Sequence, residues 1–145
     1  MKPTEAQIEK ACTDMLEADG WRTIETDLKR LRGLGVQEKG MADRLYVRYR
    51  PHPYEIHRDG RDNPRAIGWW QAVLPCQAEV LFIEWKRIRE GHKAATKPSQ
   101  HQLAWHAKER ARGALTLIAG IDFEASIEGF IRWYRESGLM RRNIR

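Results

Sequence analysis

The stretch VLFIEWKR, residues 80–87, ends an apolar run with a carboxylate and an amine two residues apart. Val80 to Ile83 are β-branched, aromatic or aliphatic, which predicts a short buried strand. Side chains alternate between the two faces of a strand, so Glu84 and Lys86 are expected to point the same way. The pair is either an ion pair at a strand end, worth under about 1 kcal/mol when exposed, or a metal-binding carboxylate beside a catalytic ammonium group.

A second carboxylate, Asp43, follows Gly40 and Met41 at the entrance to another predicted strand, near Leu45 to Tyr49. If the two strands are neighbours, Asp43 and Glu84 converge. Two carboxylates with water and a phosphate oxygen suit Mg²⁺ or Mn²⁺, which are hard cations that prefer oxygen ligands. A lysine beside such a metal can orient or deprotonate the attacking water, or offset charge in the transition state. The set favours phosphodiester hydrolysis.

Composition restricts the class of protein. The chain has 145 residues, 41% of them hydrophobic, which fits one domain with a single core. A net charge of +6 favours a polyanionic partner. From Lys29 to Arg65 there are ten Lys or Arg against five Asp or Glu, and from Lys86 to Lys97 five against one. Such runs are usually solvated surface, so they raise the expectation of nucleic-acid binding without establishing it.

Two further features concern location. The apolar stretch ALTLIAGI is too short to span a bilayer, and the N-terminal residues lack the apolar core of a signal peptide. Cys12 and Cys76 have no metal or redox spacing, which indicates two inert thiols. We therefore expect a cytoplasmic protein with no membrane partner.

The elements that must position these residues can be predicted from periodicity and capping signals. Thr4, with Gln7 three residues on, starts a helix that ends at Gly20. Asp122 is expected to cap a last helix, which Gly138 ends before a basic tail. The remaining predicted elements are strands at 21–26, 45–49, 80–83 and 114–119, a helix at 99–112, and a long loop at 51–75. This order predicts a single α/β domain with a mixed central sheet flanked by helices.

In the order of these residues the chain resembles the VRR-NUC family, the virus-type replication and repair nucleases of the PD-(D/E)XK superfamily. The family motifs occur in order between residues 4 and 120: TEAQI, GMAD, EWK and SQHQLAWH. They match Glu5, Asp43, Glu84 with Lys86, and Gln102. Each motif alone is weak, but the ordered set with fitting helix and strand context is specific.

The resemblance implies a restriction-endonuclease-like fold and a DNA endonuclease dependent on Mg²⁺ or Mn²⁺. Asp43, Glu84 and the backbone carbonyl of Trp85 would be metal ligands. Lys86 would assist the water or the transition state, and Glu5 and Gln102 would support the site from flanking helices. Small family members resemble junction resolvases, so branched or four-way junction DNA, a homodimer, and a phage or bacterial origin are also implied.

Several residues leave alternatives open. Glu9 lies one helical turn after Glu5 and competes with it for the site. Gln102 also has the spacing of a capping box with Ser99, and both roles can coexist. Ala42 stands where the family usually has proline. A nucleic-acid-binding module that keeps the fold without turnover is the alternative function.

Four bulky side chains carry separate expectations. Trp85, where the family has a small β-branched residue, is expected to pack beneath the sheet. His101 and His106 do not have zinc-binding spacing and are expected on a helix surface or in contact with phosphate. Trp133 is expected beyond the core stripe of the last helix, on a candidate dimer surface.

Overall fold

The computed structural model describes residues 1–26, 39–50 and 77–141. The loop predicted at 51–75, Cys76, and much of the first basic stretch lie outside these residues. The described elements are α1 (Glu5–Ala18), β1 (Arg22–Glu25), β2 (Arg44–Arg50), β3 (Gln77–Glu84), α3 (Gln100–Ala111), β4 (Leu115–Ile118) and α4 (Ile127–Glu136).

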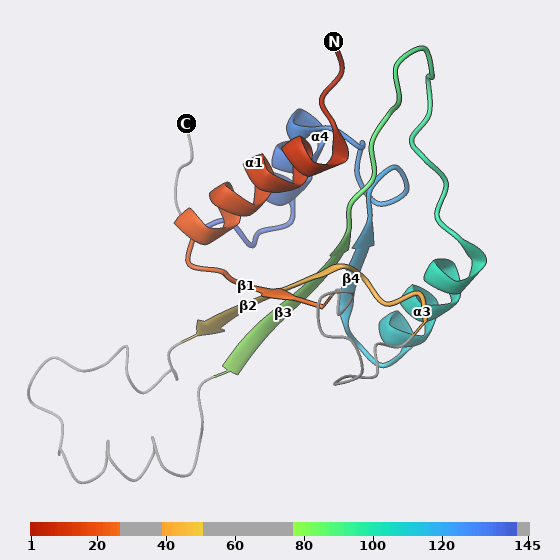
Figure 1. Cartoon of the computed structure of the whole chain (residues 1–145). Coiled ribbons are helices and arrows are strands. Elements are labelled where there is room, and N and C mark those ends of the chain that lie inside the picture. The colour runs from red at the N-terminus through yellow and green to blue at the C-terminus, as the bar shows by residue number, and fades with distance from the viewer. Residues whose placement is uncertain (27–38, 51–76, 142–145) are drawn as a thin grey trace, which may run out of the picture.

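The described strands form a mixed sheet in the order β1-β2-β3-β4 (Figure 1). β1, β2 and β3 pair antiparallel, and β4 pairs parallel to β3. Parallel strands need a crossover connection, and α3 lies within that connection. The predicted mixed α/β architecture is therefore confirmed, and the strands carrying Asp43 and Glu84 are neighbours.

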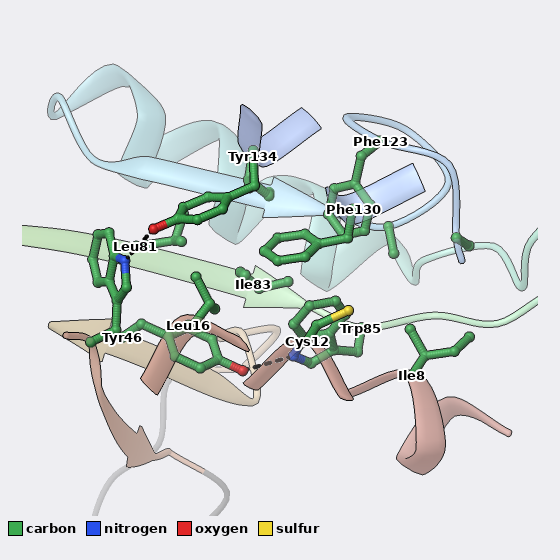
Figure 2. Packing of buried hydrophobic residues seen from close by; sticks show 14 residues of the cluster. Ile8, Cys12, Leu16, Tyr46, Leu81, Ile83, Trp85, Phe123, Phe130 and Tyr134 are labelled. Carbon is green, nitrogen blue, oxygen red and sulfur yellow. Dashed lines mark hydrogen bonds between the residues drawn. The ribbon is translucent and has the colours of Figure 1, made fainter. Parts of the chain in front are cut away.

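Helices cover both faces of the sheet (Figure 1). α1 and α4 lie together on one face, over a core that includes Leu81, Ile83 and Trp85 (Figure 2). Between them in sequence, Phe82 points the other way and meets Trp105 of α3 edge to face, with ring centroids 5.1 Å apart. The period-2 alternation of β3 thus separates a large apolar core from the side that carries Glu84.

Trp85 packs beneath the sheet, as predicted. It is fully buried, its Nε1 donates to the Tyr46 hydroxyl at 3.1 Å, and its ring meets Phe130 edge to face (Figure 2). Trp133 is also part of this aromatic group, because it stacks on Phe130 and packs against the core cluster. Trp133 is partly buried, so the prediction that it lies beyond the core stripe is wrong, while a dimer surface on α4 stays a prediction.

Local helix signals give a mixed outcome. Both predicted capping boxes are present, Thr4 with Gln7 and Ser99 with Gln102. Asp122, however, does not cap α4. Ser126 does, while the Asp122 carboxylate accepts a hydrogen bond from Ile118 N at 2.8 Å and pairs with Arg110.

The run from Val80 to Ile83 is not uniformly buried. Val80 is 38% exposed, while Leu81 and Ile83 are fully buried. The strand also starts earlier than predicted, at Gln77.

A buried cation, Arg48, lies where the second half of β2 pairs with the first half of β3. Arg48 Nε donates to Glu79 Oε2 at 2.8 Å, and Arg48 Nη1 donates to Asp19 Oδ2 at 3.0 Å. Arg48 Nη2 donates to the Leu139 carbonyl at 2.7 Å, and the guanidinium lies 4.4 Å from the Trp21 ring centroid. This Arg48 cluster joins α1, the sheet and the segment after α4. Sequence analysis did not predict it.

The remaining expectations concern the Cys12 thiol and membrane-spanning helices. Burial raises the pKa of Cys12 to about 12, so its thiol stays protonated at neutral pH, which agrees with the inert thiol predicted there. Within the described ranges, every helix is too short or too polar to cross a bilayer.

Candidate active site

Asp43 and Glu84 meet at one end of the β2–β3 pair. Arg44 lies opposite Ile83 in the antiparallel register, so one further step places Asp43 level with Glu84. Side chains directly opposite each other in such a pair point to the same face. For Glu84 this is the face covered by α3, because Phe82, two residues earlier, contacts Trp105.

Glu84, Lys86 and Gln102 form a closed triangle of contacts. Glu84 is 2% exposed, and its Oε1 lies 3.1 Å from Lys86 Nζ. Gln102 Nε2 donates to the same Oε1 at 2.6 Å, and Lys86 Nζ donates to Gln102 Oε1 at 3.2 Å. Gln102 Oε1 also accepts from Ser99 N at 2.9 Å, so the capping role and the site role coexist.

The second carboxylate oxygen of Glu84 has a different environment. Among the described residues, Glu84 Oε2 is buried and has no hydrogen-bond partner. An unsatisfied buried carboxylate oxygen is costly and rare in native structures, so it needs an explanation such as an ion or a role in chemistry.

The electrostatics agree with this arrangement. Burial raises the pKa of Glu84 to about 7; the negative charge of Asp43 adds to the shift, and Lys86 opposes it. Burial likewise raises the pKa of Glu5, which senses the charges of Lys86 and Asp43. The site therefore has more carboxylate charge than Lys86 alone compensates.

The structure separates the two competing carboxylates of α1. Glu9 Oε1 pairs with Arg44 Nε at 2.6 Å, on the α1 side of the sheet. Glu5, at the first position of α1, interacts electrostatically with Lys86, Asp43 and Glu84. Glu5 is thus placed with the other predicted site residues, and Glu9 in an ion pair with β2.

Backbone packing holds the turn before Asp43 against α3. Gly40 has φ +86°, and a Cβ at this position would lie 2.1 Å from the His101 carbonyl oxygen. Only glycine allows both this conformation and this approach. On the other side, Thr26 N donates to the Asp43 carbonyl at 3.2 Å. Ala42 is fully buried, so the residue directly before Asp43 is fixed by packing.

Asp43 and Glu84 offer carboxylate oxygens, the ligand type that Mg²⁺ and Mn²⁺ prefer. Within the part of the chain that the structure describes, no three Asp, Glu, His or Cys side chains form a metal-holding group. Mg²⁺ is usually held by one or two carboxylates together with waters and substrate phosphates. Asp43 and Glu84 supply that number of carboxylates, and Glu84 Oε2 is the oxygen available for it.

The two histidines of α3 differ. His101 is exposed, as expected. His106 is 2% exposed, and its Nδ1 contacts the Thr116 hydroxyl of β4, so its predicted surface position is wrong. The helix turns it toward the sheet beside Trp105, where the neighbouring strand supplies its partner. Burial lowers the pKa of His106 to about 4.

Comparison with known proteins adds no relative: no family model, curated protein or solved structure matches the chain.

Proposed function

We propose that the protein is a metal-dependent DNA endonuclease with a PD-(D/E)XK fold. The observation that carries the proposal is the buried contact of Glu84, Lys86 and Gln102 at the end of β3. One Glu84 carboxylate oxygen is unsatisfied among the described residues, and Asp43, directly before β2, lies level with Glu84.

The proposed metal ligands are Asp43, Glu84 and the Trp85 carbonyl. A bound Mg²⁺ or Mn²⁺ would supply Lewis-acid polarisation of a phosphate oxygen and a more acidic water. Glu84 would use Oε2 for the metal, because its Oε1 already accepts from Lys86 and Gln102. The ligand is thus held in one orientation before any ion arrives.

Lys86 acts in this proposal as the positive group beside the scissile phosphate. Its ammonium is fixed by contacts of 3.1 Å to Glu84 and 3.2 Å to Gln102. A cation held in place can orient the attacking water and offset the negative charge that develops on the phosphate without reorganising. Gln102 is a positioning residue for both groups, and Glu5 adds negative charge from α1.

The finer proposal comes from the resemblance: a homodimer that cuts branched or four-way junction DNA, within a bacterial or phage-infected cell. Both strands of a junction are cut at symmetric positions in one encounter only when two sites face related strands. Two chains related by a two-fold axis meet that requirement.

The test is a cleavage assay on linear, flap and four-way DNA of common sequence, with Mg²⁺ or Mn²⁺ and with chelator. We expect cleavage that requires metal and is lost in Asp43→Asn. The matched control is Asp14→Asn, an exposed carboxylate of α1 paired with Lys10, which should cleave normally. Cleavage that persists in chelator would contradict the metal assignment. Binding without cleavage in any metal would support the silent binding module instead.

A preference for branched DNA is tested in the same assay, with light scattering to measure mass. A strictly monomeric enzyme that degrades linear DNA as fast as junctions would contradict the dimeric resolvase proposal and leave the nuclease proposal standing.

A further inference from the structure

A basic groove lies along α3 on the side of the sheet that carries Glu84. It has a volume of about 420 Å³ and is lined by Lys39, His101, Ala104, Trp105, Lys108 and Arg112. Lys39 comes from the turn before β2, while most of the lining comes from α3. The groove therefore joins two segments that are far apart in sequence.

Among the described residues, the charges in the groove are only partly compensated. Arg112 Nη1 pairs with Glu109 Oε1 at 2.6 Å. Counting only partners among the described residues, Lys39 and Lys108 form no ion pair. Lys108 in the last turn of α3 complements the helix dipole, but Lys39 belongs to no helix in the structure. Two lysines from different segments in one concave surface favour binding of an anion.

The groove is formed by the same two segments that carry site residues, the turn before β2 and the first turn of α3. Gly40 approaches the His101 carbonyl, and this contact joins the turn that carries Lys39 and Asp43 to the first turn of α3. Lys39 lies four residues before Asp43, and His101 directly precedes Gln102. A phosphate chain lying in the groove would therefore lead to the carboxylates.

The floor of the groove indicates which part of a nucleic acid it contacts. Trp105 is 6% exposed, because its ring packs edge to face on Phe82. Bases stack on exposed aromatic faces, and no such face is available from Trp105. The groove offers charge rather than a stacking platform, which suits contacts to phosphate that carry no sequence information.

We infer that this groove binds the sugar-phosphate backbone of a DNA duplex through Lys39 and Lys108, without base stacking, and directs the strand to the Glu84 site. The inference rests on the proposed nuclease function for the choice of DNA as the polyanion.

The experiment measures binding of a labelled random-sequence duplex in chelator, where metal-dependent cleavage cannot consume the probe. Lys39→Ala and Lys108→Ala are compared with the parent protein over a salt series. The matched control is Lys10→Ala, which removes the same charge from an exposed position on α1, a helix on the other face of the sheet (Figure 1).

Each groove variant should bind several-fold more weakly and lower the slope of log affinity against log salt by about 0.9, the value expected for one lost phosphate contact. Lys10→Ala should leave the slope unchanged. A single strand should also bind the groove variants more weakly, with a slope lowered by about 0.7 for each lost contact, because stacking is not involved. Slopes equal to that of the parent, an equal loss in Lys10→Ala, or no binding by the parent would overturn the inference.

The result is separable from the proposed function. Cleavage with binding that does not depend on Lys39 or Lys108 would remove the groove and keep the nuclease. Binding that depends on both lysines, without cleavage in any metal, would keep the groove and remove the nuclease.

Discussion

The β2–β3 pair carries a buried charged cluster at each end, and the two differ in how completely they are compensated. Arg48 lies opposite Glu79 in the register and contacts it, Asp19 and the Leu139 carbonyl. Glu84 lies further along β3, about 17 Å from Glu79 at roughly 3.3 Å per residue. Its Oε1 has two donors, while its Oε2 has none among the described residues.

This difference distinguishes a structural cluster from a candidate site on the same two strands. Buried charges that are fully paired hold segments together, and removing one partner leaves the other uncompensated. A carboxylate left half satisfied, with a second carboxylate level with it, retains the capacity to bind something further. The predictions below test that contrast.

Arg48→Met should cause the largest loss of stability. It removes the guanidinium that pairs with buried Asp19 and half-buried Glu79, and losses of about 3–5 kcal/mol are typical of a broken buried pair. Urea denaturation measures the free energy of unfolding. Arg132→Met is the control, because Arg132 is exposed with its carboxylate partner 3.9 Å away, so its loss should stay under about 1 kcal/mol. Equal small losses in both variants would contradict a structural role for the Arg48 cluster.

Lys86→Ala should lower the cleavage rate by roughly 100- to 1000-fold, the scale for removing a group that stabilises transition-state charge. Its melting temperature should stay close to that of the parent, because Glu84 keeps the Gln102 donor and can take up a proton. Single-turnover cleavage and thermal unfolding are measured on the same preparation. Normal cleavage would show that Lys86 forms only an ordinary ion pair. A stability loss as large as that of Arg48→Met would show that the two clusters do not differ in structural role.

His106 offers a smaller test, because it is buried with one ring nitrogen partnered and Nε2 without a partner among the described residues. Burial lowers its pKa to about 4, Asp122 opposes the shift, and Arg110 and Lys86 add to it. An unfolded histidine has a pKa near 6.5. Between these values the unfolded chain binds a proton that the folded chain does not, so stability falls as the pH drops from 6.5 toward 4.

His106→Asn keeps a polar atom toward Thr116 and removes this titration. We expect the parent to lose about 1–2 kcal/mol more than the variant between pH 7 and pH 5, measured by urea denaturation at each pH. Carboxylates titrate in both proteins, so only the difference between them is informative. Parallel pH profiles would show that the buried imidazole does not affect stability in this way.

The elements of the fold were predictable because their signals are local. Thr4 with Gln7 and Ser99 with Gln102 sit at fixed spacing, so each capping box can be recognised before any tertiary contact is known. Asp122 has the same preference for a helix start as Ser126. Ser126 caps α4, whereas the Asp122 carboxylate pairs with Arg110 and accepts a hydrogen bond from Ile118 N.

Burial in β2 could not be predicted from its alternation. The sequence RLYVRYR alternates Leu45 and Val47 with Tyr46 and Arg48, and period-2 patterns favour burying the aliphatic face. In the structure Tyr46 and Arg48 are buried instead. Helices cover both faces of this sheet, and Arg48 is tolerated inside because partners far away in sequence surround it.

The sequence predicted that Asp43 and Glu84 converge if their two strands are neighbours. It did not allow a choice between Glu5 and Glu9 as the site carboxylate of α1. Both glutamates lie on one face of the same helix. The structure pairs Glu9 with Arg44 of β2, a contact that the sequence does not indicate, and the assignment of Glu5 to the site stays a proposal. The lysine-lined groove was also missed, because its parts come from the turn before β2 and from α3 and no spacing connects them.

The Arg48 cluster also has a consequence for the order in which the chain can mature during synthesis. Its partners come from residues 19, 79 and 139, and Arg141 N also donates to Asp19 Oδ2 at 3.0 Å. A ribosome releases these segments one after another, so a nascent chain ending before residue 139 holds Arg48 without its full set of acceptors. The set of contacts around Arg48 is therefore complete only once the segment after α4 has been synthesised.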